Sequence, residues 1–234
     1  MSSTSNAAGI ANFDDIDPLR LEPGVTLTFV QPGEPIPADT RLVIIPGSKS
    51  TVSDLAAVRK EGWDIDLLAH VRRGGLVLGL CGGYQMLGRL VSDPQGLEGA
   101  PGSVPGLGLL DVETTLLPDK TLTRISGTHV PSGTALDGYE IHLGKTTGVD
   151  CARPFALLEG RPDGAINASG QVMGSYLHGC FSSDAFRAKF LTSLGIQASE
   201  LRFEATIERV LDDLAAHLEA NLDLDLILSL AKEL

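Results

Sequence analysis

The chain has 234 residues, a hydrophobic content of 43% and a mean hydropathy of +0.13, values typical of a folded globular protein. This length suits one α/β domain of ordinary size. The formal net charge of −12 argues against a nucleic-acid backbone or an anionic membrane surface as partner. No apolar run approaches the roughly 18 residues of a membrane span. The first residues, MSSTSNAAG, lack the basic and apolar regions of a signal peptide.

The N-terminal residues 1–9 are small and polar, and we expect them to be disordered or a non-native start of the chain. An acidic stretch, Ala11–Leu19, follows and reads as a loop with one helical turn. Two strand-like segments follow at Val25–Val30 and Leu42–Ile45. Two helical segments come next, Ser50–Arg59 and Trp63–Val71, and then the strand-like Leu76–Leu80. Strands and helices of these lengths predict an open parallel sheet with helices on its faces.

The pattern changes after residue 90. Asp93–Gly108 is rich in Gly and Pro and predicts an irregular loop. Short strand-like segments separated by turns follow at 109–117, 121–130, 138–143, 155–159, 164–167 and 171–177. Asp184–Leu194 and Phe203–Leu218 are amphipathic helices, and the leucine-rich tail from Asn221 favours helix over strand. We see no sign of a second domain.

A G-x-C-x-G pattern, Gly79 to Gly83, stands between an apolar strand and a helix-like stretch. A strand that feeds a helix through one sharp turn holds the central residue in a strained conformation with its side chain exposed. The N-terminus of a helix favours thiolate over thiol. We therefore predict that Cys81 is a nucleophile rather than a buried structural cysteine, which is the alternative.

The other two cysteines, Cys151 and Cys180, form no C-x-x-C pair with each other or with Cys81. We therefore expect neither a disulfide framework nor a metal site in this chain. Free thiols fit a reducing, cytoplasmic location.

A cysteine nucleophile needs a base. His178 ends a strand and is followed by glycine, so its ring can project from the carboxyl edge of the sheet, where the turn at Cys81 also opens. His70 and His217 lie in amphipathic helices, where half-exposed positions are expected. His129 has no supporting motif. His178 is the candidate base.

The negatively charged oxygen of a tetrahedral intermediate needs fixed backbone donors. Gly82, directly after the cysteine, offers one N–H, and Gly47 in the turn after the neighbouring strand offers a second. That turn, PGSKST, lacks the spacing of a phosphate-binding loop, so nucleotide binding is not expected there.

Four segments in chain order, IPGSKST, LGLCGGYQMLG, GYEIHLG and GSYLHGCF, resemble the class I glutamine amidotransferase domain of the cobyric acid synthase type. IANFDDIDPL adds to the resemblance, which covers about residues 10–220 and implies one amidotransferase domain over 10–234. It implies a flavodoxin-like, open and mostly parallel sheet with helices on both faces. In such domains the cysteine attacks the side-chain amide of glutamine, ammonia leaves, and water hydrolyses the thioester.

Carried over to this chain, the resemblance makes Cys81 the nucleophile, His178 the base, and Gly47 and Gly82 the oxyanion hole. It places Gln85 against the substrate glutamine. Three residues of GYEIH also read as facing the substrate, although strand packing explains each equally well: Tyr139, Glu140 and His142.

One departure from the class concerns the partner of the base. Most of these domains have H-P-E, whose glutamate orients the histidine, but Gly179 and Cys180 follow His178 here. The resemblance therefore implies a Cys–His dyad in which a backbone carbonyl or a water molecule orients His178, and a slower or partner-dependent glutaminase.

A second departure is that cobyric acid synthases carry an N-terminal ATP-dependent synthetase domain, which nothing in this chain matches. The resemblance implies that this chain itself needs no cofactor, and that ATP and magnesium are used by a synthetase domain or subunit that handles a corrinoid. The joint reaction would amidate carboxylates of adenosylcobyrinic acid a,c-diamide in cobalamin biosynthesis. Three alternatives remain open. One is a glutaminase subunit of another ATP-dependent ligase, such as the muramyl ligase type, and the second is a non-catalytic remnant that only binds. The third is a cysteine hydrolase of the α/β-hydrolase type, which would need an Asp or Glu to orient the histidine.

Overall fold

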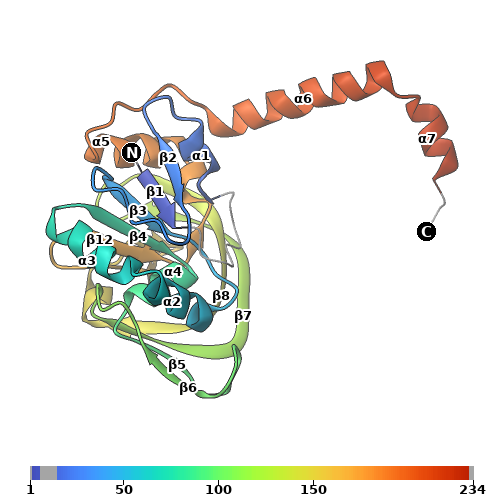
Figure 1. Cartoon of the computed structure of the whole chain (residues 1–234). Coiled ribbons are helices and arrows are strands. Elements are labelled where there is room, and N and C mark those ends of the chain that lie inside the picture. Colours follow the sequence, from blue (N-terminus) through green and yellow to red (C-terminus); the bar gives the residue numbers. More distant parts are fainter. Residues whose placement is uncertain (1, 6–14, 232–234) are drawn as a thin grey trace. The chain divides into compact units, whose positions relative to one another are not determined.

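The computed structural model describes residues 2–5 and 15–231 (Figure 1). Residues up to Ser199 form one compact unit, and residues from Glu200 form a second. No helix in the described part of the chain is long and apolar enough to cross a membrane.

The first unit contains a six-stranded sheet that holds the segments predicted from the first half of the sequence. Its strands, in spatial order, are β11 (Ala165–Ile166), β12 (Val172–Ser175), β4 (Leu76–Leu80), β3 (Leu42–Ile45), β1 (Ser2–Ser5) and β2 (Leu27–Val30). All neighbours are parallel except the β11–β12 pair. The predicted open, mostly parallel sheet is confirmed.

Strand β1 was not predicted. Ser2–Ser5 pairs in parallel with both β2 and β3, so the expectation of disorder over residues 1–9 is wrong for this segment. Strand pairing uses backbone N–H and C=O groups, and a polar Ser/Thr segment can supply these as an apolar one would. Residues 6–9, and residues 10–14 of the IANFDDIDPL motif, lie outside the described residues.

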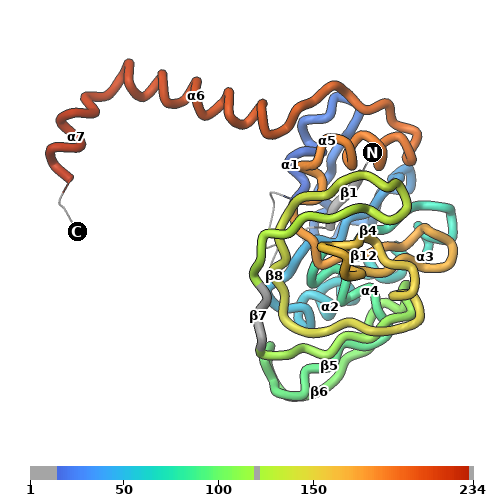
Figure 2. Tube along the Cα trace, turned by 180° about the vertical axis from the view of Figure 1, so that it is seen from behind, coloured from blue at the N-terminus to red at the C-terminus, as the bar shows by residue number. Residues whose placement is uncertain are grey.

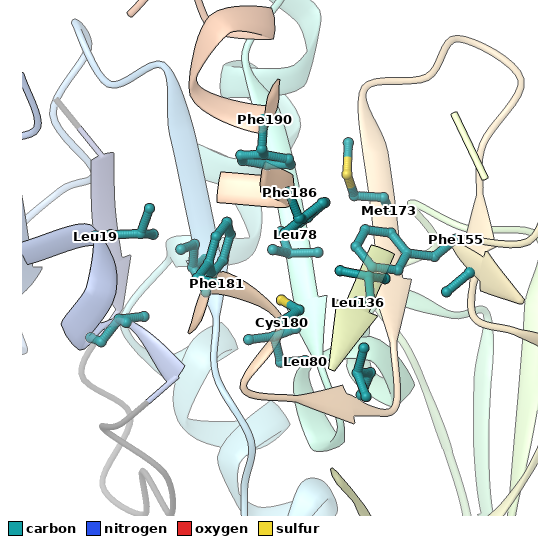
Figure 3. Packing of buried hydrophobic residues seen from close by; sticks show 14 of the residues in the cluster. Leu19, Leu78, Leu80, Leu136, Phe155, Met173, Cys180, Phe181, Phe186 and Phe190 are labelled. Carbon is teal, nitrogen blue, oxygen red and sulfur yellow. The ribbon is translucent and has the colours of Figure 1, made fainter. Parts of the chain in front are cut away.

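Alternate residues of the central strands pack on opposite faces of the sheet. Ile44 and Leu78 join the cluster that contains α5 (Asp184–Ser193) and the short α1 (Asp17–Arg20). Figure 3 shows Leu78 with other members of this cluster. Ile45 and Val77 join the cluster on the other face, which holds three further helices: α2 (Thr51–Lys60), α3 (Trp63–Arg72) and α4 (Gly82–Leu87). Helices therefore cover both faces, as predicted.

A second, largely antiparallel sheet gathers the strands of the second half. Its path is β10 (Arg161–Asp163), β9 (Ala156–Leu158), β7 (Val112–His129), β5 (Leu90–Asp93) and β6 (Gly102–Pro105). Strand β8 (Ala135–Gly148) forms a long hairpin with β7 and also pairs with β13 (Leu177–His178), and Figure 2 shows β7 and β8 side by side. The sequence predicted only separate short strands here. The expected irregular loop over Asp93–Gly108 is wrong where β6 pairs with β5.

The second unit contains α6 (Phe203–Asn221) and α7 (Leu224–Leu230), so helix is confirmed for both segments. Neither helix has a buried residue among those described. All residues of the site described below belong to the first unit.

Candidate active site

Cys81 stands directly after β4 and caps the N-terminus of α4. Its backbone has φ 51° and ψ −111°, a conformation that is costly for a residue with a Cβ and that characterises nucleophile elbows. A methyl group on Gly83 would overlap the carbonyl oxygen of Ile45, so only glycine allows α4 to approach β3 this closely. The predicted elbow is present.

Three neighbouring parallel strands end at the same edge of the first sheet. The Cys81 N–H donates to the Ser175 carbonyl at the end of β12, over 2.9 Å. On the other side of β4, β3 ends at Ile45 and leads into the turn that contains Gly47. A methyl group on Gly47 would lie 3.6 Å from Cys81 Cβ and 3.0 Å from His178 Cε1. Gly47 therefore lies between the two side chains that the sequence singled out.

His178 reaches this edge by a route that the sequence did not indicate. Strand β12 ends at Ser175, and the chain crosses to the second sheet, where His178 pairs with Tyr139 of β8. The imidazole there forms a hydrogen bond with the Cys81 side chain. The thiol of Cys81 also lies 3.2 Å from the Ile141 carbonyl. The structure thus brings together the nucleophile and the base named from the sequence.

A carboxylate stands behind the imidazole. His178 Nδ1 lies 2.7 Å from Asp15 Oδ2, and the Gly179 N–H donates to Asp15 Oδ1 over 2.7 Å. The expectation that a carbonyl or water orients His178 in a dyad is therefore wrong. It failed because Asp15 stands 163 positions earlier in the chain, where no local pattern links it to the histidine.

The surroundings of His178 favour its protonated form. Burial disfavours the imidazolium, but hydrogen bonds to Asp15 and Cys81 and the charges of both groups outweigh it and raise the pKa of His178 to about 10. A protonated imidazole beside the cysteine is the partner that a thiolate nucleophile requires.

The two proposed oxyanion donors lie in segments that face each other. A methyl group on Gly82 would lie 3.0 Å from the Ser48 nitrogen, so the elbow and the Gly47–Ser48 turn face each other.

A cavity of about 270 Å³ opens beside Cys81 and His178. Gln85 lies in its wall, as predicted for a substrate contact, but its amide is already engaged. Its Oε1 accepts from the Thr51 hydroxyl at 2.8 Å, and its Nε2 donates to the Leu143 carbonyl at 2.9 Å. Gln85 therefore ties α2, α4 and β8 together around the cavity.

Two of the three GYEIH residues contact other groups of the protein. The Tyr139 ring stacks on the His178 ring, with centroids 5.1 Å apart, and Tyr139 does not line the cavity. Glu140 is buried and pairs with Arg161 at 2.5 Å, also away from the cavity. These contacts are the strand packing that was the alternative reading for both residues.

His142 does line the cavity. Its ring stacks on Tyr176, with centroids 3.8 Å apart. Burial lowers the pKa of His142, and the nearby Glu140 carboxylate opposes this only in part. His142 is therefore less readily protonated than a free histidine.

The remaining histidines have structural places. His70 is 1% exposed rather than half-exposed, and its Nε2 lies 2.9 Å from the Leu76 carbonyl. The His129 ring packs edge-on against Phe155, and burial lowers its pKa to about 4. His217 lies on α6, where no residue is buried. No group of three or more metal-ligating side chains occurs among the described residues.

The sequence reasoning missed two charged residues of the cavity, Lys49 and Glu98. Lys49 belongs to PGSKST, which was considered only as a phosphate loop. Glu98 lies in the segment predicted to be irregular, and its Oε2 accepts from the Val52 N–H over 2.9 Å. The charge of both residues was the only available signal.

Comparison with known proteins identifies the family. The profile of the CobB/CobQ-like glutamine amidotransferase domain matches residues 5–186. The chain belongs to this family. As a CobB/CobQ-like domain, it is 64% identical over 223 residues to cobyric acid synthases of Cereibacter sphaeroides and Rhodobacter capsulatus. Each alignment covers 95% of this chain and 46% of the relative, so the chain spans about half the length of the curated relatives it matches.

Solved structures show the same fold for this CobB/CobQ-like domain. PurLQS from Thermotoga maritima superposes with a TM-score of 0.63 at 17% identity, covering 82% of this chain and 98% of that chain. A second structure, described as a glutamine amidotransferase, gives a TM-score of 0.56 at 17% identity and covers 82% of this chain and 97% of the other. The predicted class I amidotransferase fold is confirmed.

Proposed function

We propose that this chain hydrolyses glutamine to glutamate and ammonia, with Cys81 as nucleophile and His178 as general acid and base. The observation that carries the proposal is the strained cysteine at the end of β4, hydrogen-bonded to a protonated histidine at the mouth of a cavity. Membership of the CobB/CobQ-like family supports the same reaction.

The proposed steps follow from the groups around Cys81. The thiolate attacks the side-chain carbonyl carbon of glutamine, and the oxygen that becomes negative is stabilised by the Gly47 and Gly82 N–H groups. His178 gives its proton to the departing nitrogen, which leaves as ammonia. The imidazole then removes a proton from water, which attacks the thioester and releases glutamate.

Lys49 and Glu98 supply opposite charges to the cavity that would receive glutamine. Free glutamine carries an α-ammonium and an α-carboxylate. We assign Glu98 to the α-ammonium and Lys49 to the α-carboxylate, because each charged group of the substrate then faces a side chain of opposite charge. The assignment makes the amino acid, rather than any amide, the substrate.

The larger reaction that we propose is ammonia supply to an ATP- and magnesium-dependent synthetase that amidates the carboxylates of adenosylcobyrinic acid a,c-diamide. Support comes from the relatives named cobyric acid synthase, at 64% identity. The same names favour this partner over a ligase of the muramyl type. We place the reaction in the cytoplasm, a reducing compartment that suits the three free cysteines.

Labelling with an electrophilic glutamine analogue tests the proposed nucleophile. Incubation with a diazoketone analogue of glutamine should modify Cys81 alone, with mass-spectrometric mapping as the readout. Cys151 and Cys180 are internal controls, since both are free thiols outside the cavity. Glutamine should protect Cys81, and Cys81→Ala should abolish ammonia release.

Three results would contradict the proposal in different ways. Labelling at Cys151 or Cys180 would refute the nucleophile. Labelling of Cys81 without ammonia release, with or without an added synthetase domain of a cobyric acid synthase, would indicate a remnant that only binds. Ammonia transfer to a different ligase acceptor, with none to the corrinoid, would refute the proposed partner.

A further inference from the structure

The Asp15 carboxylate is fixed behind the base by two hydrogen bonds. One oxygen faces His178 Nδ1 and the other accepts from the Gly179 N–H, each over 2.7 Å. The side chains of Asp15 and His178 are each 1% exposed. Because both oxygens are engaged and water is excluded, the carboxylate can hold the imidazole in one orientation.

The residues after His178 cannot supply this carboxylate. Gly179 has φ 78°, a left-handed conformation that turns the chain immediately after the histidine. Cys180, two positions after His178, is 1% exposed and lies in the hydrophobic cluster with Leu80 (Figure 3). A carboxylate at position 180 would be buried among apolar side chains, at high cost in free energy. The place behind the imidazole is therefore open to a residue from elsewhere.

We propose that Asp15 is the positioning residue of the site and completes a Cys–His–Asp triad from the segment before helix α1. Asp15 touches neither Cys81 nor the cavity, so it acts only through His178. With its acceptor at Nδ1, the imidazole keeps a proton there and directs Nε2 towards the sulfur. This inference rests on the proposed glutaminase activity and adds a third residue to it.

The protonation of His178 agrees with this role. Asp15 contributes both a hydrogen bond and a negative charge to the raised pKa of His178. Without the carboxylate, burial would act with less opposition and His178 would lose its proton at lower pH. The step in which His178 protonates the departing nitrogen would then be lost above a lower pH limit than in the wild type.

The test compares Asp15→Asn with a matched structural control. Asparagine keeps the shape of the aspartate side chain but has only one oxygen that can accept a hydrogen bond. Both oxygens of Asp15 accept one. Glu22→Gln is the control, because Glu22 also forms a buried ion pair at 2.7 Å, with Arg187, and lies outside the cavity. Ammonia release from glutamine is measured over pH 5.5–10, together with the melting temperature of each variant.

The expected result separates positioning from folding. Asp15→Asn should lower kcat by on the order of 100-fold, the scale of one impaired acid–base step, with KM within about twofold. The alkaline limb of the pH profile of kcat for Asp15→Asn should move to lower pH by at least about one unit. Glu22→Gln should lower the melting temperature but keep the wild-type pH profile. Asp15→Glu should recover part of the lost kcat.

Two results would overturn the proposal while leaving the glutaminase activity intact. One is an Asp15→Asn enzyme with wild-type kcat and pH profile. The other is a lower kcat with an unchanged pH profile and a melting temperature lowered as in Glu22→Gln, which would mean a structural role alone. If Asp15→Asn does not fold, the NMR titration of His178 in the wild-type chain decides, and a midpoint near the ordinary 6.5 refutes the proposal. Failure of the wild-type chain to release ammonia would instead refute the proposed function.

Discussion

Charged residues of both signs stand at the site, some in a buried pair and others at the cavity wall. Asp15 and a protonated His178 form a pair with almost no exposure, and Lys49 and Glu98 line the cavity. The members of the first pair lie 2.7 Å apart. Lys49 and Glu98 carry charge at the wall of the cavity, so substrate affinity should depend on them.

Replacing Lys49 with methionine should weaken glutamine binding without changing the chemistry. A hydrogen bond to a charged group contributes about 1.5–3 kcal/mol, so KM should rise roughly tenfold or more while kcat stays within about twofold. Lys60→Met is the matched control, since Lys60 lies at the other end of α2 and outside the cavity. Steady-state kinetics of ammonia release gives both constants. An unchanged KM in Lys49→Met would refute the role assigned to Lys49.

The elements that carry the site belong to two sheets. Strands β3 and β4 and the elbow of α4 present Gly47, Cys81 and Gly82, whereas β8 and the two-residue β13 present His178. The reacting groups therefore depend on how β13 pairs with β8, a contact of only two residue pairs. Gly138 permits this pairing, because a methyl group there would overlap the His178 carbonyl oxygen.

Replacing Gly138 with alanine should separate His178 from Cys81. The added methyl group must push β13 away from β8, so ammonia release should fall by on the order of 100-fold, the contribution of a displaced general base. Gly102→Ala is the control, since Gly102 lies in β6 of the same sheet and a methyl group there meets only a carbonyl oxygen at 4.0 Å. Equal activity of the two variants would show that the β8–β13 pairing does not position the base.

At the scale of the whole molecule, the described site residues all lie in the unit that ends at Ser199. That unit joins a parallel sheet with helices on both faces to an antiparallel sheet, and both sheets contribute to the same hydrophobic cluster. Polar groups buried where the sheets meet make the stability of the fold depend on pH. Asp163 is the clearest case, because burial outweighs its hydrogen bonds to Ser175 and Tyr176 and raises its pKa to about 6.

The change from wild type to Asp163→Asn should raise the stability of the protein more at pH 8 than at pH 5. A carboxyl whose pKa is raised in the folded state favours folding while it is protonated, and this contribution is lost as pH rises through about 6. The neutral amide avoids that loss. Melting temperatures of the variant and the wild type at pH 5 and pH 8 measure the difference, with the exposed Asp39→Asn as control. A difference that does not grow with pH would contradict the burial of a charge at Asp163.

Sequence reasoning succeeded where the controlling interactions are local. The apolar run before Cys81 and the glycines on either side of it encode the elbow within a few residues, and the backbone of Cys81 has the strained conformation expected of it. It failed for Ser2–Ser5, because strand pairing there uses backbone groups that do not depend on side-chain polarity. It could not tell which groups Tyr139 and Glu140 contact, because these neighbours depend on the pairing of β8 with β7 and β13.

The sequence by itself determined the family, the parallel sheet, and the cysteine and histidine of the candidate site, because motifs and strand–helix periodicity are short-range properties. Only the tertiary structure decided what stands behind the histidine. Asp15 and His178 lie 163 positions apart and meet because the chain returns across two sheets before its last strand. A contact of that separation is fixed by the packing of the whole unit, and no local pattern records it.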